Sequence, residues 1–216
     1  MATRSNTDPI RPEGGGLRER KKRQTRQALG LVAIRLAIER GLGNVRVDDI
    51  AAEVGVSTRT FNNYFTSKQE AICALALDRN RSIAEQLRAR PAGEALWDAV
   101  TAAVLTQYEV NEASSPEWTA GVRLVTSEPT LIGEYLKAQA QLRHELALAI
   151  TQRVPAGTDD LVGGIIAGAV TAMIEFCVDR WLSADPPVPL GPLIHHGLDV
   201  LAGQLAGPAG PPTLEK

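Results

Sequence analysis

The sequence predicts an all-α protein, with a three-helix domain near the N-terminus followed by a longer helical bundle. Three observations support this fold class. Apolar residues recur at the three- and four-residue spacing of amphipathic helices, and no stretch alternates as a strand does. Glycines and prolines divide the chain into segments of helix length. The length of 216 residues and the 44% hydrophobic content suffice for a real core.

The composition divides the chain into four parts. Residues 1–16 are rich in Gly, Pro and polar side chains, which predicts a disordered arm. Residues 17–66 form the three-helix domain and residues 67–206 the helical bundle, while residues 207–216 are expected to be a loose tail. The first helix is predicted to end at Gly41. Its buried residues are predicted to be Leu29, Ala33, Leu36 and Ala37.

The segment from Val47 to Phe65 predicts two short helices that meet at a glycine turn. Gly55 ends the first helix, because glycine enters the left-handed backbone region freely. Ser57 is a good N-cap for the second helix. On that second helix Phe61 and Phe65 lie one turn apart and are expected to face the core. This arrangement is a helix-turn-helix.

The opposite face of the second helix carries polar side chains that suit DNA. Arg59 and Asn63 lie opposite the two phenylalanines, and Arg, Asn and Thr match base edges and phosphates in a major groove. A helical hairpin with a merely polar surface is the alternative interpretation. The predicted DNA-contacting residues are Arg46, Thr58, Arg59, Thr60, Asn62, Asn63, Tyr64 and Lys68, with Arg18, Lys22 and Arg26 in the preceding basic segment.

Both flanks of this segment favour DNA binding. Leu17–Arg26 holds six basic residues against one acid, Glu19. Lys68 lies in the first turn of a helix, where the helix dipole disfavours a cation, so we expect an anionic partner such as phosphate. Residues 1–68 contain 13 basic and 7 acidic side chains, whereas residues 69–216 contain 10 basic and 18 acidic ones. A basic module on an acidic body fits nucleic-acid binding at one end.

Together these residues resemble the DNA-binding domain of the tetracycline-repressor (TetR) family of bacterial transcription regulators. Three positions depart from the family pattern. Asn62 stands where the family usually has a DNA-contacting tyrosine, Arg46 replaces a capping Thr or Ser, and Ala37 replaces a core phenylalanine. The matching residues are Arg26, Arg35-Leu36, Gly41, Val47–Ala51, Gly55–Ser57, Arg59–Phe61, Asn63–Phe65 and Ser67-Lys68.

The body is predicted as helices separated by prolines. Its expected spans are 67–89, 92–111, 117–125, 129–154, a helix from 159 or 160 to about 182, and a last helix that ends near Leu205. The segment Leu161–Val178 is apolar enough to raise the question of a membrane span. Glu175 and three glycines within it favour a helix buried on nearly all sides of a protein, so no membrane role is expected.

This apolar helix and the last helix are the predicted dimer interface. Gly164, Gly168, Thr171 and Glu175 share one stripe, which would allow another helix to approach closely. The apolar face of the last helix, which includes Ile194 and Leu198, is wider than one monomer needs. The family resemblance also implies a homodimer built through a four-helix bundle at this position.

No constellation of residues in the sequence indicates catalysis or a cofactor. Neither a nucleophile elbow nor a phosphate loop is present, so an enzyme is not expected. His195 and His196 are adjacent and point in different directions, which disfavours a shared metal. Cys73 and Cys177 form neither a disulfide framework nor a metal pattern. These features and the lack of a signal peptide predict a cytoplasmic protein.

The large or polarisable residues of the body are candidates for an internal ligand pocket. They are Trp97, Tyr108, Trp118, Arg123, Tyr135, Met173 and Phe176. Ordinary core packing is the alternative for each of them. The family resemblance implies an effector pocket here, and the run Arg123–Leu131 resembles an actinobacterial subgroup thought to bind acyl-CoA-like ligands. We therefore expect a small apolar effector, an acyl-CoA or fatty acid, with Arg123 at its acidic or thioester head.

The sequence thus predicts a sequence-specific, dimeric, ligand-responsive transcription regulator, a repressor that binds a palindromic operator in double-stranded DNA. One alternative is a helical small-molecule-binding protein or enzyme whose basic N-terminus is incidental. A second alternative retains DNA binding without an effector.

Overall fold

The structure is a computed structural model that describes residues 15–109, 116–155, 157, 159, 161–186 and 188–205. Every regular element within these residues is helical, in agreement with the predicted all-α class. The predicted arm, except Gly15 and Gly16, and the predicted tail 207–216 lie outside the described residues. The predicted helix end at residues 110 and 111 and the possible helix start at residue 160 lie outside them as well.

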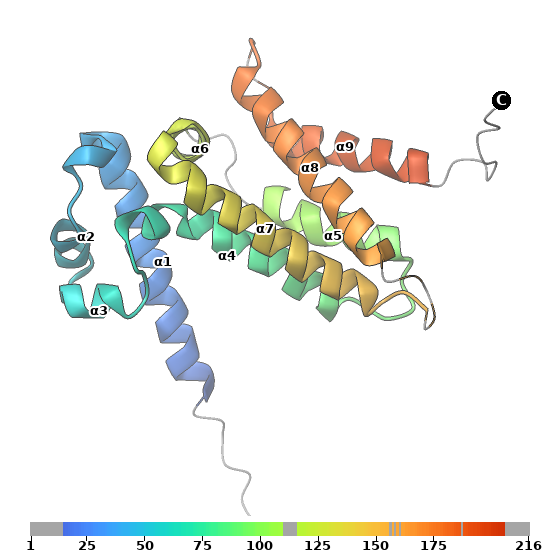
Figure 1. Ribbon diagram of the computed structural model, residues 1–216, viewed down its shortest axis with the longest axis horizontal. Helices are drawn as coiled ribbons and strands as arrows, with labels where there is room; N and C mark the ends of the chain where they lie inside the picture. Colours follow the sequence, from blue (N-terminus) through green and yellow to red (C-terminus); the bar gives the residue numbers. More distant parts are fainter. Residues whose placement is uncertain are drawn as a thin grey trace, which may run out of the picture.

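One long helix and three short elements form the N-terminal part of the molecule (Figure 1). They are α1 (Gly15–Arg40), the 3-10 turn η1 (Leu42–Asn44), α2 (Val47–Val54) and α3 (Thr58–Asn62). The predicted stop signal is confirmed, since Gly55 has φ 76° in the left-handed region. The predicted cap is also confirmed, because Ser57 Oγ accepts from the Thr60 amide at 3.1 Å. Local hydrogen bonding therefore sets both sides of the turn.

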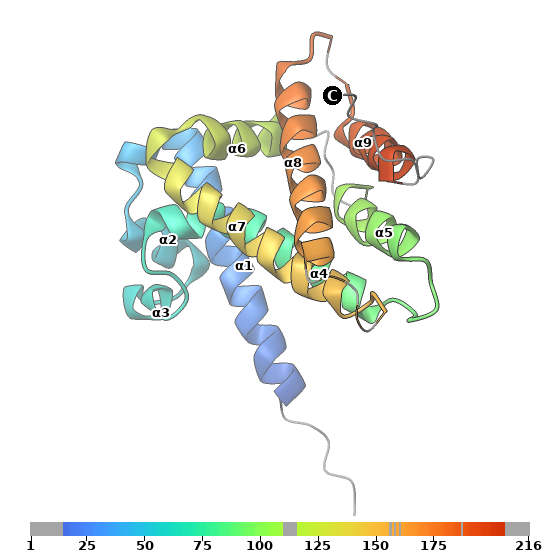
Figure 2. The ribbon, with the colours of Figure 1, turned by 45° about the vertical axis from the view of Figure 1, so that its right-hand side comes forward.

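Six further helices form the body. They are α4 (Lys68–Ala89), α5 (Leu96–Glu109), α6 (Pro116–Ser127), α7 (Pro129–Thr151), α8 (Leu161–Ser183) and α9 (Leu190–Leu205). Figures 1 and 2 both show α4 running from the N-terminal helices into the body beside α7, with α8 and α9 at the end away from α2 and α3. Ser67 Oγ accepts from the Glu70 amide at 3.0 Å and so caps the start of α4.

Two hydrophobic cores share helix α4. The N-terminal core surrounds Phe61 and Phe65 and includes the predicted Leu29, Ala33, Leu36 and Ala37. Ile72 of α4 and Leu131 of α7 complete this core, while Ile83 and Leu87 of α4 belong to the core of the body. Helix α4 therefore connects the two parts of the molecule through side chains in both cores.

Helix α8 is not buried on nearly all sides, so that expectation is wrong. It is the one helix within the described residues that is long and apolar enough to cross a membrane, with a mean hydropathy of 2.1. One face, with Ala167, Val170 and Ile174, packs inside the body. The other face leaves Ile165 63% and Phe176 67% exposed. The apolar side chains Ile165 and Phe176 of α8 therefore lie largely uncovered within the described subunit.

The predicted interface on α9 is also wrong in its residues. Ile194 and Leu198 are both 0% exposed and pack on α5 and α8 inside the subunit. The apolar face of α9 is wide because α9 packs against two helices of its own subunit, α5 and α8. Gly164 and Gly168 of α8 have open space where a Cβ would lie, whereas Gly163 packs on α7, with a Cβ position 2.9 Å from the Ala147 carbonyl oxygen.

Candidate DNA interface and internal cavity

Helix α3 is held on the N-terminal core by two phenylalanines and presents its polar side outward. Phe61 and Phe65 are fully buried, with ring centroids 5.5 Å apart. Thr58 Oγ1 donates to Asp48 Oδ1 at 2.8 Å, which ties the start of α3 to α2. Arg59 and Asn63 are exposed, as the helical spacing predicts. The fold therefore presents a short polar helix on a rigid support.

The other residues predicted to contact DNA differ in exposure. Thr60 and Tyr64 are half-buried, and the Thr60 hydroxyl shares a 2.9 Å hydrogen bond with Ser57. The residues whose side chains are exposed are Arg46, Thr58, Asn62, Arg18 and Lys22. Thr58 and Asn62 lie on α3 with Arg59, where they can contact base edges. Arg18 and Lys22 lie on α1, where they can attract DNA of any sequence.

Arg26 does not project freely from α1, contrary to the role predicted for it. Its Nη1 donates to the Tyr64 carbonyl oxygen at 2.9 Å, and its Nε donates to Asp78 Oδ1 at 3.3 Å. Its Cζ lies 4.4 Å from the centroid of Phe65. These contacts join α1, α4 and the residues after α3, so the guanidinium is used inside the domain.

Lys68 has backbone partners in place of the expected phosphate. Its Nζ donates to the carbonyl oxygens of Leu42 and Val45, each at 2.8 Å. Those carbonyls belong to the 3-10 turn η1 and the residue that follows it, which have few helical hydrogen bonds of their own. The charge of Lys68 therefore fastens this turn to the start of α4.

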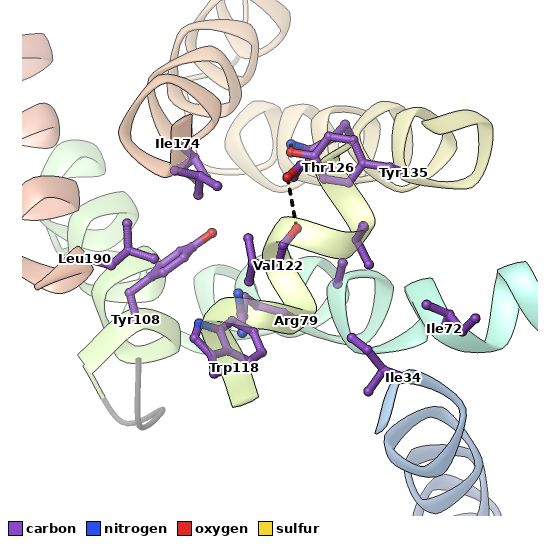
Figure 3. A pocket seen from close by; sticks show the side chains of 15 residues that line it. Ile34, Ile72, Arg79, Tyr108, Trp118, Val122, Thr126, Tyr135, Ile174 and Leu190 are labelled. Carbon is purple, nitrogen blue, oxygen red and sulfur yellow. Dashed lines mark hydrogen bonds between the residues drawn. The ribbon is translucent and has the colours of Figure 1, made fainter. Parts of the chain in front are cut away.

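An internal cavity of about 70 Å³ lies in the body, between α4, α6, α7 and α8 (Figure 3). Three of the predicted pocket residues line it: Tyr108, Trp118 and Tyr135. Tyr135 Oη accepts from Gln139 Nε2 at 3.0 Å, and burial, with a smaller contribution from Glu175, raises the pKa of Tyr135 to about 12. The remaining walls are mostly apolar, with Ile72, Val122, Val125, Ile174 and Val178 among them.

Four of the predicted pocket residues do not line this cavity. Arg123 is exposed, and its Nη2 donates to the Leu182 carbonyl oxygen at 2.9 Å. Phe176 projects from the open face of α8. Trp97 and Met173 pack against the body core, as the alternative of ordinary core packing predicted. A list of large residues does not reveal which side of a helix faces a cavity.

The sequence analysis missed Arg79, the one guanidinium that lines the cavity among the described residues. Its Cζ lies 4.1 Å from the Trp118 ring centroid and 5.2 Å from that of Tyr108. Burial lowers the pKa of Arg79, and Tyr108 opposes this shift. A signal was present, because Arg79 continues the inward spacing of Ile72 and Ala76 along α4.

A larger groove of about 670 Å³ adjoins the cavity and opens between α1, α4 and α6. Ile34, Arg79, Trp118 and Gly121 line both spaces. A Cβ at Gly121 would lie 2.8 Å from Ile34 Cδ1, so α6 and α1 pack closely at this point. The cavity therefore shares a wall with the longest helix of the N-terminal part.

Comparisons with known proteins agree for both parts of the chain. Residues 31–72 match the family model described as bacterial regulatory proteins, tetR family, and residues 94–206 match the MftR C-terminal domain. The HTH-type transcriptional regulator TcmR of Streptomyces glaucescens is 34% identical over 155 residues, which cover 69% of each chain.

Two solved structures share the fold. A protein of Syntrophomonas wolfei described as a TetR-family transcriptional regulator has a TM-score of 0.63 at 18% identity, covering 86% of this chain and 97% of that one. FadR of Thermus thermophilus, a TetR-family repressor in complex with lauroyl-CoA, has a TM-score of 0.55 at 17% identity, with the same coverage of each chain.

Proposed function

This chain belongs to the TetR family of bacterial transcription regulators. From this membership we propose that two copies of the chain together bind a palindromic operator. Binding of an apolar effector then releases the protein from the DNA. The chain is accordingly a DNA-binding regulator of the ligand-responsive repressor type. Its place of action is the cytoplasm, where it meets its operator. The residues that perform each step are part of the proposal.

The observation that carries the DNA-binding role is the exposed face of α3. Arg59 reads a base edge, a guanine by preference, because its fork matches two acceptors of guanine in the major groove. Thr58, Asn62 and Asn63 add contacts to bases or phosphates, and Arg46 contacts the backbone. Arg18 and Lys22, exposed on α1, supply attraction that is independent of DNA sequence. Arg26 and Lys68 act only by holding the domain together.

The open face of α8 supports a homodimer. Leu161, Ile165 and Phe176 are more than half exposed and recur at helical spacing on one side. Gly164 and Gly168 lie on α8 with open space beside them, so a partner helix can approach closely there. Val200 extends the apolar surface onto α9. Pairing of α8 and α9 with their copies buries this surface and leaves both α3 helices free to enter successive grooves about 34 Å apart.

The internal cavity and its groove support an effector site. The mostly apolar walls of the cavity fit the acyl part of a fatty acid or acyl-CoA, and the structural relative FadR is seen with lauroyl-CoA. A ligand that enters between α4 and α6 displaces α6 against Ile34 of α1. Operator affinity then falls only as far as the ligand prefers the displaced state.

A gel-shift experiment with DNA from upstream of the gene itself tests the DNA-binding role. We expect a shifted band of protein-bound DNA. Unlabelled DNA with a scrambled inverted repeat should not remove this band. Titration of fatty acids and acyl-CoAs by calorimetry, with and without operator, tests the effector. Coupling of about 1–3 kcal/mol loosens the complex roughly 5- to 150-fold, and operator weakens ligand binding by the same factor. A helical binding protein or enzyme would show no specific band, and a regulator without an effector would show no coupling.

A further inference from the structure

We propose that Arg79 is the anion-binding residue of the internal cavity and selects an apolar molecule that carries a free carboxylate. The inference rests on the proposed effector function and deepens it. It replaces Arg123, which lies outside the cavity, with Arg79 of α4, which lines it. It also distinguishes a fatty or aromatic acid from an acyl thioester.

The first observation is that Arg79 forms no ion pair with any side chain that the structure describes. Arg35 in the adjoining groove pairs with Glu39 and Glu53, and Asp78 pairs with Arg26. A buried guanidinium normally has a carboxylate partner, because its desolvation is otherwise uncompensated. An anionic ligand supplies that partner.

The second observation is the hydrogen-bonding state of the guanidinium. Arg79 Nε is buried and has no hydrogen-bond partner among the described residues. Nε and the neighbouring Nη form the edge with which arginine binds the two oxygens of a carboxylate. Tyr108 is a side-chain hydrogen-bond partner of the guanidinium, but burial raises the pKa of this phenol, so it is neutral and supplies no negative charge.

The third observation is that the guanidinium is held in place before any ligand arrives. Figure 3 shows Arg79, Tyr108 and Trp118 together on one side of the cavity, with Tyr135 and Thr126 on another. The Trp118 ring covers the guanidinium at 4.1 Å, which restrains the side chain without occupying its edge. The apolar walls formed by Ile72, Val122 and Ile174 then receive the hydrocarbon part of the acid.

A single positive charge in a small cavity favours one negative charge over a phosphate dianion. The cavity has a volume of about 70 Å³, which suits a carboxylate and the first part of its chain. The groove of about 670 Å³ shares Arg79 and Trp118 with the cavity and gives the rest of the molecule a path outward. A thioester carbonyl carries no charge and would leave the guanidinium without its partner.

Matched probes test the head group on the full-length protein. Hexanoate, decanoate and 2-naphthoate are compared with their methyl esters, and decanoate also with decanoyl-CoA, by isothermal titration calorimetry. At least one acid is expected to bind more tightly than its ester by roughly tenfold to a hundredfold, as a charge-assisted hydrogen bond predicts. The variant Arg79→Met should abolish this preference and leave the affinity for the ester unchanged. Arg81→Met, on an exposed position of the same helix, should retain the preference.

The melting temperature of the ligand-free protein separates this role from simple packing. Arg79→Met removes a desolvated charge, so the variant should melt at the same temperature or higher. A large fall in melting temperature, with acid and ester binding lost together, would make Arg79 a packing residue and overturn the proposal. Equal affinity for acids and esters, or tight binding of the thioester alone, would overturn it and leave the effector cavity standing. If no probe binds, the proposed fatty-acyl effector fails together with the role of Arg79.

Discussion

The guanidinium of Arg26 lies over the ring of Phe65, with Cζ 4.4 Å from the ring centroid. The same side chain donates to the Tyr64 carbonyl oxygen and to Asp78 of α4. One cation thereby connects α1, α4 and the residues that follow α3. A basic residue at the end of a basic segment is thus part of the support for the recognition helix.

The first prediction concerns Arg26→Met. The free energy of unfolding should fall by about 1–2 kcal/mol, because a partly exposed ion pair, a cation–π contact and a hydrogen bond are lost together. Urea denaturation measures this change. The salt dependence of operator binding should stay as in the wild type, since Arg26 contacts no phosphate. If the variant were as stable as the wild type and its operator affinity depended less on salt, Arg26 would be a DNA-contacting residue.

The second prediction concerns the exposed basic segment of α1. Replacing Arg20, Lys21 and Lys22 with Gln should lower affinity for operator and random DNA alike. Each lost phosphate contact should reduce the slope of log K against log salt by about 0.9. Fluorescence anisotropy at several salt concentrations measures the slope. An unaltered slope would mean that these residues only keep α1 solvated.

The third prediction concerns Arg59→Ala. Loss of a bidentate base contact should cost about 1–3 kcal/mol of discrimination at each half-site, with the fold intact. Operator affinity should therefore fall much more than affinity for random DNA. Arg143→Ala, at an exposed position of α7, is the control and should change neither. Full operator affinity in Arg59→Ala would remove this residue from base readout.

The fourth prediction concerns the open face of α8. Ile165→Glu would bury two carboxylates in a symmetric interface, so the dimer should dissociate at micromolar concentration while each subunit remains folded. Light scattering and circular dichroism measure the two outcomes. Leu136→Glu, on α7 and 57% exposed, is the matched control and should remain dimeric. Leu198→Glu, at a fully buried position, should unfold the body instead. A dimeric Ile165→Glu variant would place the interface on another face.

The fifth prediction concerns alkaline pH. Burial, assisted by Glu134, raises the pKa of the Cys73 thiol from 9.0 to about 12. Above pH 9 the unfolded chain therefore releases a proton that the folded chain retains, so stability is lost as pH rises from about 9 toward 12. The loss is at most about 1.4 kcal/mol per pH unit for this group. Urea midpoints at pH 8 and 10.5 measure it. Cys73→Ala should show a shallower decline, and an identical decline would assign the effect to other groups.

Short-range interactions explain why the sequence by itself determined most of the fold. The turn at Gly55 and the caps at Ser57 and Ser67 depend on backbone conformation and on amides only three residues away. The inward positions of Phe61 and Leu36 follow from helical periodicity alone. The face of α3 that carries Arg59 was therefore predictable, because a core-facing side specifies the opposite side as well.

Only the tertiary structure decided which partner each long side chain and each apolar face has. Arg26, Lys68 and Arg123 find carbonyl oxygens that are 38, 26 and 59 residues away in sequence, and no local pattern encodes such pairs. The apolar surfaces of α8 and α9 look alike in sequence. However, Ile194 and Leu198 of α9 are buried against α5 and α8, whereas Ile165 and Phe176 of α8 remain exposed. The position of Arg79 along α4 indicated that its side chain points inward. Only the arrangement of α4, α6, α7 and α8 around it, however, creates a cavity at that place. Periodicity specifies the direction in which a side chain points, and the packing of distant helices specifies what it meets.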